Sequence, residues 1–215
     1  MLMWGHRVYR KTNKTTQPIR SQSDRDALIS YFLHRNLRDY ALFVFGIYTG
    51  RRIADLVALN VRDVAYIDRK SRFCVVDRLK IRERKTGKFV DLLLHSYARR
   101  ALSKYLRKRL KSAPSMGALL NEPLFKSLKV GRGGEQRGIT KQHAWYVLTN
   151  AARVCGLNYK IGTHSLRKTF GYIQHQNGTS IELIQRMLNH RSPEITLSYI
   201  GITRDDMDEA ILSMD

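Results

Sequence analysis

A run of apolar and aromatic side chains in the first quarter of the chain constrains the fold most strongly. It extends from Tyr40 to Tyr48 and contains no charged residue. A membrane-spanning helix needs about 20 such residues, and no apolar run in the chain reaches that length. We therefore predict a buried helix inside a soluble domain, covered by other segments of the chain.

Polar residues that favour helix starts indicate where the covering helices begin. The segment 23–26 resembles a capping box in front of an apolar stretch, so we expect a helix to start there. A basic amphipathic helix is expected over 96–110. Another is expected from the capping residue Thr140 through Arg153.

The last third of the chain, from residue 163 to 215, predicts four short helices. Ser180 is expected to cap one of them. The pair Ser192-Pro193 is expected to open the next, because proline is favoured in the first helical turn, and Gly201 follows its end.

The pattern between Phe73 and Leu94 is that of strands. Short β-branched runs are interrupted by a turn sequence at 85–88, which predicts a small antiparallel sheet with a tight turn. The glycine-rich segment 131–138 matches no phosphate-binding fingerprint and is expected to be a DNA-facing loop. The expected fold class is α+β, mainly α-helical, with one domain over 21–215.

The charge balance indicates a polyanionic partner. Lys and Arg number 39 against 18 Asp and Glu, a formal net charge of +21. Residues 1–20 contain no acid, which is typical of a basic arm that follows phosphate backbones or of a disordered solubilising tail. We find no signal-peptide pattern and expect a cytoplasmic protein that binds double-stranded DNA and no membrane.

The cysteine pattern favours neither disulfides nor a metal. Cys74 and Cys155 lie far apart, and no Cys/His spacing typical of a metal site surrounds them. We interpret both as structural thiols and expect neither a metal nor a cofactor.

Five short motifs contain residues able to act on a phosphodiester. Each has an ordinary interpretation by itself, such as a surface charge, an exposed turn lysine or a packed aromatic ring. In chain order they are T-G-R-R-I-A-D-L at 49–56, K-T-G-K at 85–88, T-H-S-L-R-K-T-F at 163–170, L-N-H at 188–190 and T-L-S-Y-I at 196–200.

In this order and spacing, the motifs resemble the tyrosine recombinase (phage integrase) family, from about residue 18 to 215. The resemblance implies the family's catalytic core and a metal- and ATP-independent chemistry through a 3′-phosphotyrosine. It implies that two arginines clamp the scissile phosphate, a hairpin lysine protonates the leaving oxygen, two histidines assist, and a tyrosine is the nucleophile. The matching positions are Arg52, Arg167, Lys85, His164, His190 and Tyr199.

Three positions depart from the family pattern. Asp55 stands where the family often has the glutamate that orients the first arginine. Arg51 replaces an apolar residue, and its added charge is expected either to contact DNA or to disturb packing. Asn189 replaces a glycine before the second histidine, His190. The expected domain layout also differs from that of most family members, because it includes no separate core-binding domain.

Further DNA contacts and partners follow from charge and from the resemblance. The candidate DNA-contacting residues are Arg51, Lys88, Arg132, Arg137 and Lys141. The resemblance implies a tetramer in which the C-terminal helix, residues 205–215, docks on a neighbouring subunit; docking on its own domain is the competing interpretation. An accessory DNA-binding protein is a further expected partner.

Two other functions remain open on the sequence. A type IB topoisomerase uses similar residues but relaxes supercoils as a monomer. A basic DNA-binding regulator would keep the scaffold without catalysis. Integration, excision, inversion and dimer resolution are equally compatible with the sequence.

Overall fold

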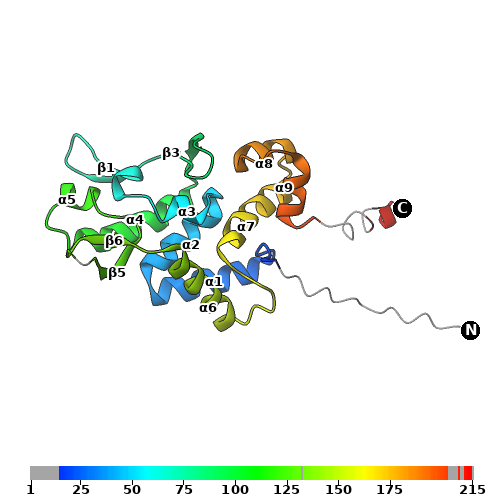
Figure 1. The fold of residues 1–215 in the computed structure, drawn as a ribbon, viewed down its shortest axis with the longest axis horizontal. Coiled ribbons are helices and arrows are strands. Elements are labelled where there is room, and N and C mark those ends of the chain that lie inside the picture. Colours follow the sequence, from blue (N-terminus) through cyan, green and yellow to red (C-terminus); the bar gives the residue numbers. More distant parts are fainter. Residues whose placement is uncertain (1–14, 132, 203–207, 209–210, 215) are drawn as a thin grey trace, which may run out of the picture.

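The computed structural model describes residues 15–131, 133–202, 208 and 211–214, and its centre is the predicted buried helix (Figure 1). This helix, α2 (Leu37–Thr49), begins at Asn36, whose side chain accepts hydrogen bonds from the Arg38 and Asp39 amides. Gly50 caps its C-terminal end with a φ of 61°, a left-handed conformation that glycine adopts without strain. The apolar side chains from Ala41 to Phe45 and that of Ile47 are at most 3% exposed, which confirms the predicted buried helix.

Three helices pack directly on α2 and form the core: α1 (Gln22–Arg35), α4 (Ser96–Leu110) and α7 (Thr163–Gln176). α2 and α7 approach closely because Gly46 lacks a side chain, and a Cβ there would lie 2.5 Å from Leu166 Cδ1. α6 (Lys141–Val154), capped by Thr140 as predicted, contacts both α1 and α7. Short helical segments α3 (Ile53–Leu56), η1 (Val61–Asp63) and α5 (Met116–Leu120) connect these elements.

Within the described residues, the strands pair as three separate two-stranded antiparallel sheets. β1 (Ala65–Ile67) pairs with β2 (Phe73–Val75), and β5 (Lys126–Val130) pairs with β6 (Gln136–Gly138). β3 (Arg78–Arg82) and β4 (Phe89–Leu93) form the predicted hairpin, with Arg82 opposite Phe89 at the turn. The expectation of one sheet over 73–94 is therefore wrong for β2, and part of the expected loop 131–138 is a strand.

The last two helices that are fully described, α8 (Ile181–Leu188) and α9 (Pro193–Ile200), pack against α7 at the end of the molecule away from β5 and β6 (Figure 1). Their predicted caps are confirmed, since Ser180 accepts from the Leu183 amide and Ser192 from the Ile195 amide. The predicted C-terminal helix over 205–215 falls largely outside the described residues.

The chain start differs from the prediction at two points. Ser21, rather than the predicted box at 23–26, caps α1 by accepting a hydrogen bond from the Asp24 amide. Ile19 is fully buried, and its amide donates to Thr169 Oγ1 over 2.8 Å. The folded unit therefore starts before the predicted boundary at residue 20. Among the described residues, no helix is long and apolar enough to cross a membrane.

Replacing Ile19 with Ala should lower the free energy of unfolding by about 2–4 kcal/mol, because the cavity left in the core cannot fully collapse. Urea denaturation would measure the change. Ile67→Ala is the matched control, since Ile67 is 37% exposed, and its cost should stay below about 1 kcal/mol. Equal costs for the two variants would show that the segment before α1 contributes no core packing.

Candidate active site

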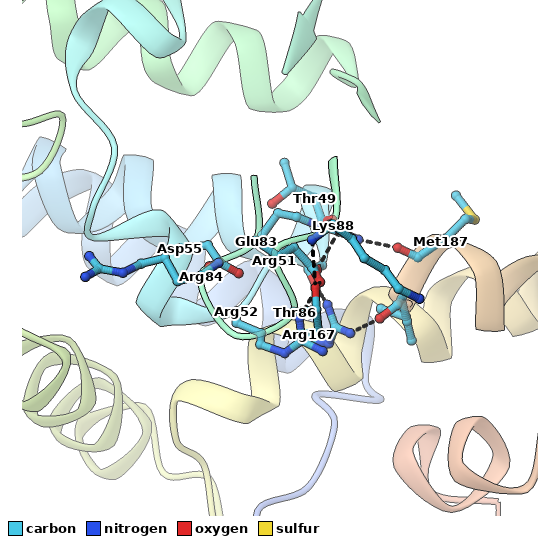
Figure 2. A network of polar contacts seen from close by, with 12 residues as sticks. Thr49, Arg51, Arg52, Asp55, Glu83, Arg84, Thr86, Lys88, Arg167 and Met187 are labelled. Carbon is cyan, nitrogen blue, oxygen red and sulfur yellow. Dashed lines mark hydrogen bonds and ion pairs between the residues drawn. The ribbon is translucent and has the colours of Figure 1, made fainter. Parts of the chain in front are cut away.

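Two guanidinium groups from different helices converge beside the end of α2. Arg52 is the N-cap residue of α3, and Arg167 is buried on α7 with 2% exposure. Arg167 donates from Nη1 to the Gly50 carbonyl oxygen over 2.8 Å, and from Nη2 to the Leu188 carbonyl oxygen (Figure 2). Burial, together with the charge of Arg52, lowers the pKa of Arg167 to about 10. The arginine stays charged at neutral pH, and these contacts hold it in place.

A buried carboxylate, Glu83, lies between Arg52 and its neighbour Arg51. Arg52 Nη1 lies 2.8 Å from Glu83 Oε2, and Arg51 Nη1 lies 3.2 Å from Glu83 Oε1. Among the described residues Arg52 Nη1 has no aligned hydrogen bond, so its contact with Glu83 is an ion pair by distance alone. Nη1 is itself buried, but the Arg52 side chain as a whole is 20% exposed, so its outer part can reach another anion.

Two sequence predictions about this cluster are wrong. Asp55 was expected to orient Arg52, but its Oδ1 accepts from the Arg84 amide over 2.9 Å, and Glu83 takes its place beside Arg52. Arg51 was expected to contact DNA or disturb packing, yet it is 1% exposed and donates to the carbonyl oxygens of Thr49 and Met187. Arg51 is thus a core residue, because Glu83 and two backbone oxygens satisfy its charge and donors.

The hydroxyl of Tyr199 lies next to the imidazole of His164. Tyr199 comes from α9 and His164 from α7, and the Tyr199 Oη to His164 Nδ1 distance is 3.1 Å. Burial raises the pKa of the Tyr199 hydroxyl, while the charges of Arg167 and Arg52 and a hydrogen bond from Arg167 oppose this rise. Partial burial, then the charges of Lys168 and Arg167, lower the pKa of His164. At neutral pH the imidazole is neutral and able to accept a proton.

The second histidine, His190, packs against the same tyrosine. The two rings lie 4.9 Å apart, edge to face, and His190 Nδ1 lies 3.1 Å from Thr196 Oγ1. The preceding Asn189 adopts the left-handed conformation, with φ of 51°, at the end of α8. Asparagine tolerates this conformation better than most residues, so Asn189 can occupy the position where the family pattern has glycine. Burial, then Arg167 and Arg52, lower the pKa of His190 to about 4.

The hairpin lysine and the other predicted DNA-contacting residues differ in their exposure and in their pairing with acidic side chains. Lys85 is exposed at the β3–β4 turn, and its charge acts on His164. Lys88 is exposed on the same turn, and Arg137 is exposed but paired with Glu135. Arg132 lies outside the described residues.

A hollow of about 440 Å³ opens beside the two arginines. Its lining includes Arg52, His164 and Arg167, together with Lys141 and the half-exposed Trp145 at the start of α6. Lys141 therefore borders the same hollow as the arginines. Within the part of the chain that the structure describes, no group of three His, Cys, Asp or Glu residues is arranged to hold a metal ion.

The comparison with protein families decides the assignment, because the model described as the phage integrase family matches residues 21–205. The chain belongs to this family. It is 39% identical over 189 residues to the probable integrase/recombinase YoeC of Bacillus subtilis, covering 88% of this chain and 91% of YoeC. It is 29% identical to the tyrosine recombinase XerD of Corynebacterium glutamicum, covering 81% of this chain and 51% of XerD. The chain thus spans about half the length of XerD.

Solved structures of recombinases share the fold of this phage integrase family member. The XerA recombinase superposes with a TM-score of 0.67 at 24% identity, covering 92% of this chain and 65% of XerA. The XerH recombinase bound to palindromic difH substrate, in a post-cleavage complex, superposes with a TM-score of 0.63 at 18% identity. This match covers 94% of this chain and 54% of XerH. The predicted mainly helical catalytic fold of the family is confirmed.

Two residues at this family member's site escaped the sequence analysis. Lys168 lies with its Nζ 5.3 Å from the centre of the Tyr199 ring. Its place directly after Arg167 in a recognised motif was a usable signal. Glu83 stands two residues before the predicted hairpin lysine, but no periodicity or spacing marks a carboxylate there as the partner of Arg52.

Acid should destabilise this integrase family member through His190. The unfolded chain binds a proton at this imidazole below about pH 6.5, whereas the folded protein resists protonation until its pKa of about 4. Stability should therefore fall as the pH decreases through this window, because the unfolded state binds more protons. Urea denaturation above and below the window should show a smaller fall for His190→Asn than for wild type. Identical falls would contradict the prediction.

Proposed function

We propose that this chain is a site-specific DNA recombinase that cuts and rejoins strands through a 3′-phosphotyrosyl intermediate at Tyr199. The observation that carries this proposal is the position of the Tyr199 hydroxyl, 3.1 Å from a neutral imidazole and beside two charged guanidiniums. Membership of the phage integrase family and the likeness to YoeC support the recombinase assignment.

The first chemical step is attack by the Tyr199 oxygen on a DNA phosphorus. The O–P bond forms while the bond from phosphorus to the 5′ oxygen breaks, and the phenol proton passes to His164. Arg52 and Arg167 stabilise the charge that grows on the non-bridging oxygens, because each guanidinium offers several fixed N–H donors. The Arg52 side chain is the more exposed of the two and lines the hollow, whereas Arg167 donates two hydrogen bonds to backbone carbonyl oxygens.

The remaining oxygens are served by the hairpin and by His190, which lies between α8 and α9. Lys85, exposed on the β3–β4 turn, gives a proton to the departing 5′ oxygen. Thr196 Oγ1 lies 3.1 Å from His190 Nδ1 and 3.4 Å from the Ser192 carbonyl oxygen, and its single hydrogen can serve only one of them. In the proposed reaction the hydroxyl donates over the shorter contact, to Nδ1, and the Nε2 hydrogen of His190 binds a phosphate oxygen. One ester replaces another, so a 5′ hydroxyl can reverse the step without ATP.

Assembly and location follow from the same proposal. Four basic residues bind backbone phosphates of double-stranded DNA around the cut: Lys88, Lys141, Arg132 and Arg137. The acidic segment 205–215 docks on a neighbouring copy, so that four copies form the synaptic complex in the cytoplasm, and an accessory DNA-binding protein helps to place the site.

Covalent capture tests this proposal. Wild-type protein is incubated with a library of nicked duplexes that lose the 5′ hydroxyl strand on cleavage, and the attached DNA and the modified peptide are both sequenced. Attachment through a 3′ phosphate to Tyr199 is the expected result. Binding without attachment would identify a DNA-binding regulator, and relaxation of plasmids without any preferred sequence or recombinant product would identify a topoisomerase.

A further inference from the structure

The carboxylate of Glu83 links the elements that carry the reacting groups. Its side chain is fully buried, with Oε1 3.2 Å from Arg51 and Oε2 2.8 Å from Arg52. Oε2 also accepts a hydrogen bond from Thr86 Oγ1 over 2.8 Å. Figure 2 shows these side chains gathered around Glu83, with Arg167 beside them. One carboxylate thus contacts residues that follow α2 and residues of the β3–β4 turn.

The backbone of Glu83 also closes the turn that carries Lys85. The Glu83 amide donates to the Lys88 carbonyl oxygen over 2.9 Å, and the Gly87 amide donates to the Glu83 carbonyl oxygen over 2.8 Å. Thr86, which binds the Glu83 carboxylate, is adjacent to Lys85 in sequence. The side chain of Glu83 therefore anchors the turn against the arginines.

The charges around Glu83 explain why the arrangement depends on it. Arg51, Arg52 and Arg167 place three positive charges close together. Burial first, and then the charge of Arg52, lowers the pKa of both other arginines. Asp55 is near, but it hydrogen-bonds to the Arg84 amide. Without the charge of Glu83, mutual repulsion would turn Arg52 toward solvent, since its side chain is 20% exposed and can move.

We propose that Glu83 is a positioning residue for strand cleavage, holding Arg52 in the hollow and the Lys85 turn beside it through direct contacts with Arg52 and Thr86. This inference rests on the proposed function. Glu83 does not touch the DNA; it acts through the arginine that binds the scissile phosphate.

The test uses the duplex identified by covalent capture, called the captured duplex. It compares the single-turnover cleavage of this duplex by Glu83→Gln and by wild type at saturating DNA. The rate constant should fall by about 10- to 100-fold, because a misplaced donor stabilises the transition state poorly. The reactive fraction and the DNA affinity should stay close to those of wild type. Glu122→Gln is the matched control, since Glu122, between α5 and β5, also pairs with an arginine, Arg109 of α4, over 2.5 Å. It should cleave at the wild-type rate.

A second substrate separates positioning from a general structural effect. A duplex with a neutral methylphosphonate at the cut has less need of Arg52, so the penalty of Glu83→Gln should shrink on it. An equal penalty on both duplexes, or a wild-type rate for Glu83→Gln, would overturn the inference.

If Glu83→Gln fails to fold, a second pair of variants still tests the inference. Arg51→Met removes the most deeply buried charge that Glu83 neutralises, so Arg51→Met and Arg51→Met/Glu83→Gln can be compared directly. The double variant should be slower than Arg51→Met, and equal rates would overturn the inference. If wild type forms no covalent product with any duplex, the proposed function fails; if wild type reacts and the Glu83 variants match their references, only the positioning role fails.

Discussion

Tyr199→Phe should abolish covalent attachment to DNA, with a fall in rate on the order of 10⁴ or more, as expected when a nucleophile is removed. The variant keeps the aromatic ring that packs against the small cluster of Phe170, Ile184 and Leu188. It loses only the hydroxyl and its hydrogen bonds, a change in stability of about 1 kcal/mol. DNA binding should therefore persist while attachment to the captured duplex disappears from denaturing gels.

The matched control for this prediction is Tyr66→Phe. Tyr66 is 48% exposed on β1, away from α7 and α9 (Figure 1). Its loss should leave attachment unchanged. Attachment by Tyr199→Phe at the wild-type rate would assign the nucleophile to another residue and contradict the proposed function.

Arg52→Lys should slow cleavage of the captured duplex by about 10²–10³-fold, the usual loss when a fixed donor to a developing oxyanion is removed. Lysine keeps the charge but provides a single ammonium in place of the planar fork that fits two phosphate oxygens. Because the charge remains, the affinity for DNA should change little. Single-turnover rates at saturating DNA, together with binding titrations, would separate the two effects.

Arg72→Lys is the control for the same exchange. Arg72 is exposed and pairs with Asp68 over 2.7 Å within the β1–β2 region. Its rate should equal that of wild type. An equally small effect of Arg52→Lys would mean that charge alone, without the fork geometry, stabilises the phosphate.

Local sequence signals predicted much of the framework. The run from Tyr40 to Tyr48 lies in the buried helix α2, because nine consecutive residues without a charged side chain are most stable in the core. The caps Thr140, Ser180 and Ser192 were predicted correctly, since capping depends on residues only two or three positions away. The same locality explains the error at the first helix, where Ser21 and Ser23 offer similar side chains and tertiary packing selects the start.

The strand pairing was harder to predict than the strands themselves. β2 has the β-branched pattern that marked 73–94 as a sheet, yet it pairs with β1 and leaves β3 and β4 as a separate hairpin. A strand pattern of period two shows which residues prefer an extended backbone, but it does not name the partner strand.

The sequence by itself determined the family and the central helix, and it predicted the groups that are proposed to act on a phosphate, because motif order and local periodicity are properties of the chain read along one dimension. Only the tertiary structure decided the partners of those groups. It placed Glu83 instead of Asp55 beside Arg52, and it buried Arg51. Those choices depend on which charges meet in a desolvated interior, where an unpaired ion is costly and the nearest carboxylate in space neutralises it, whatever its distance along the chain.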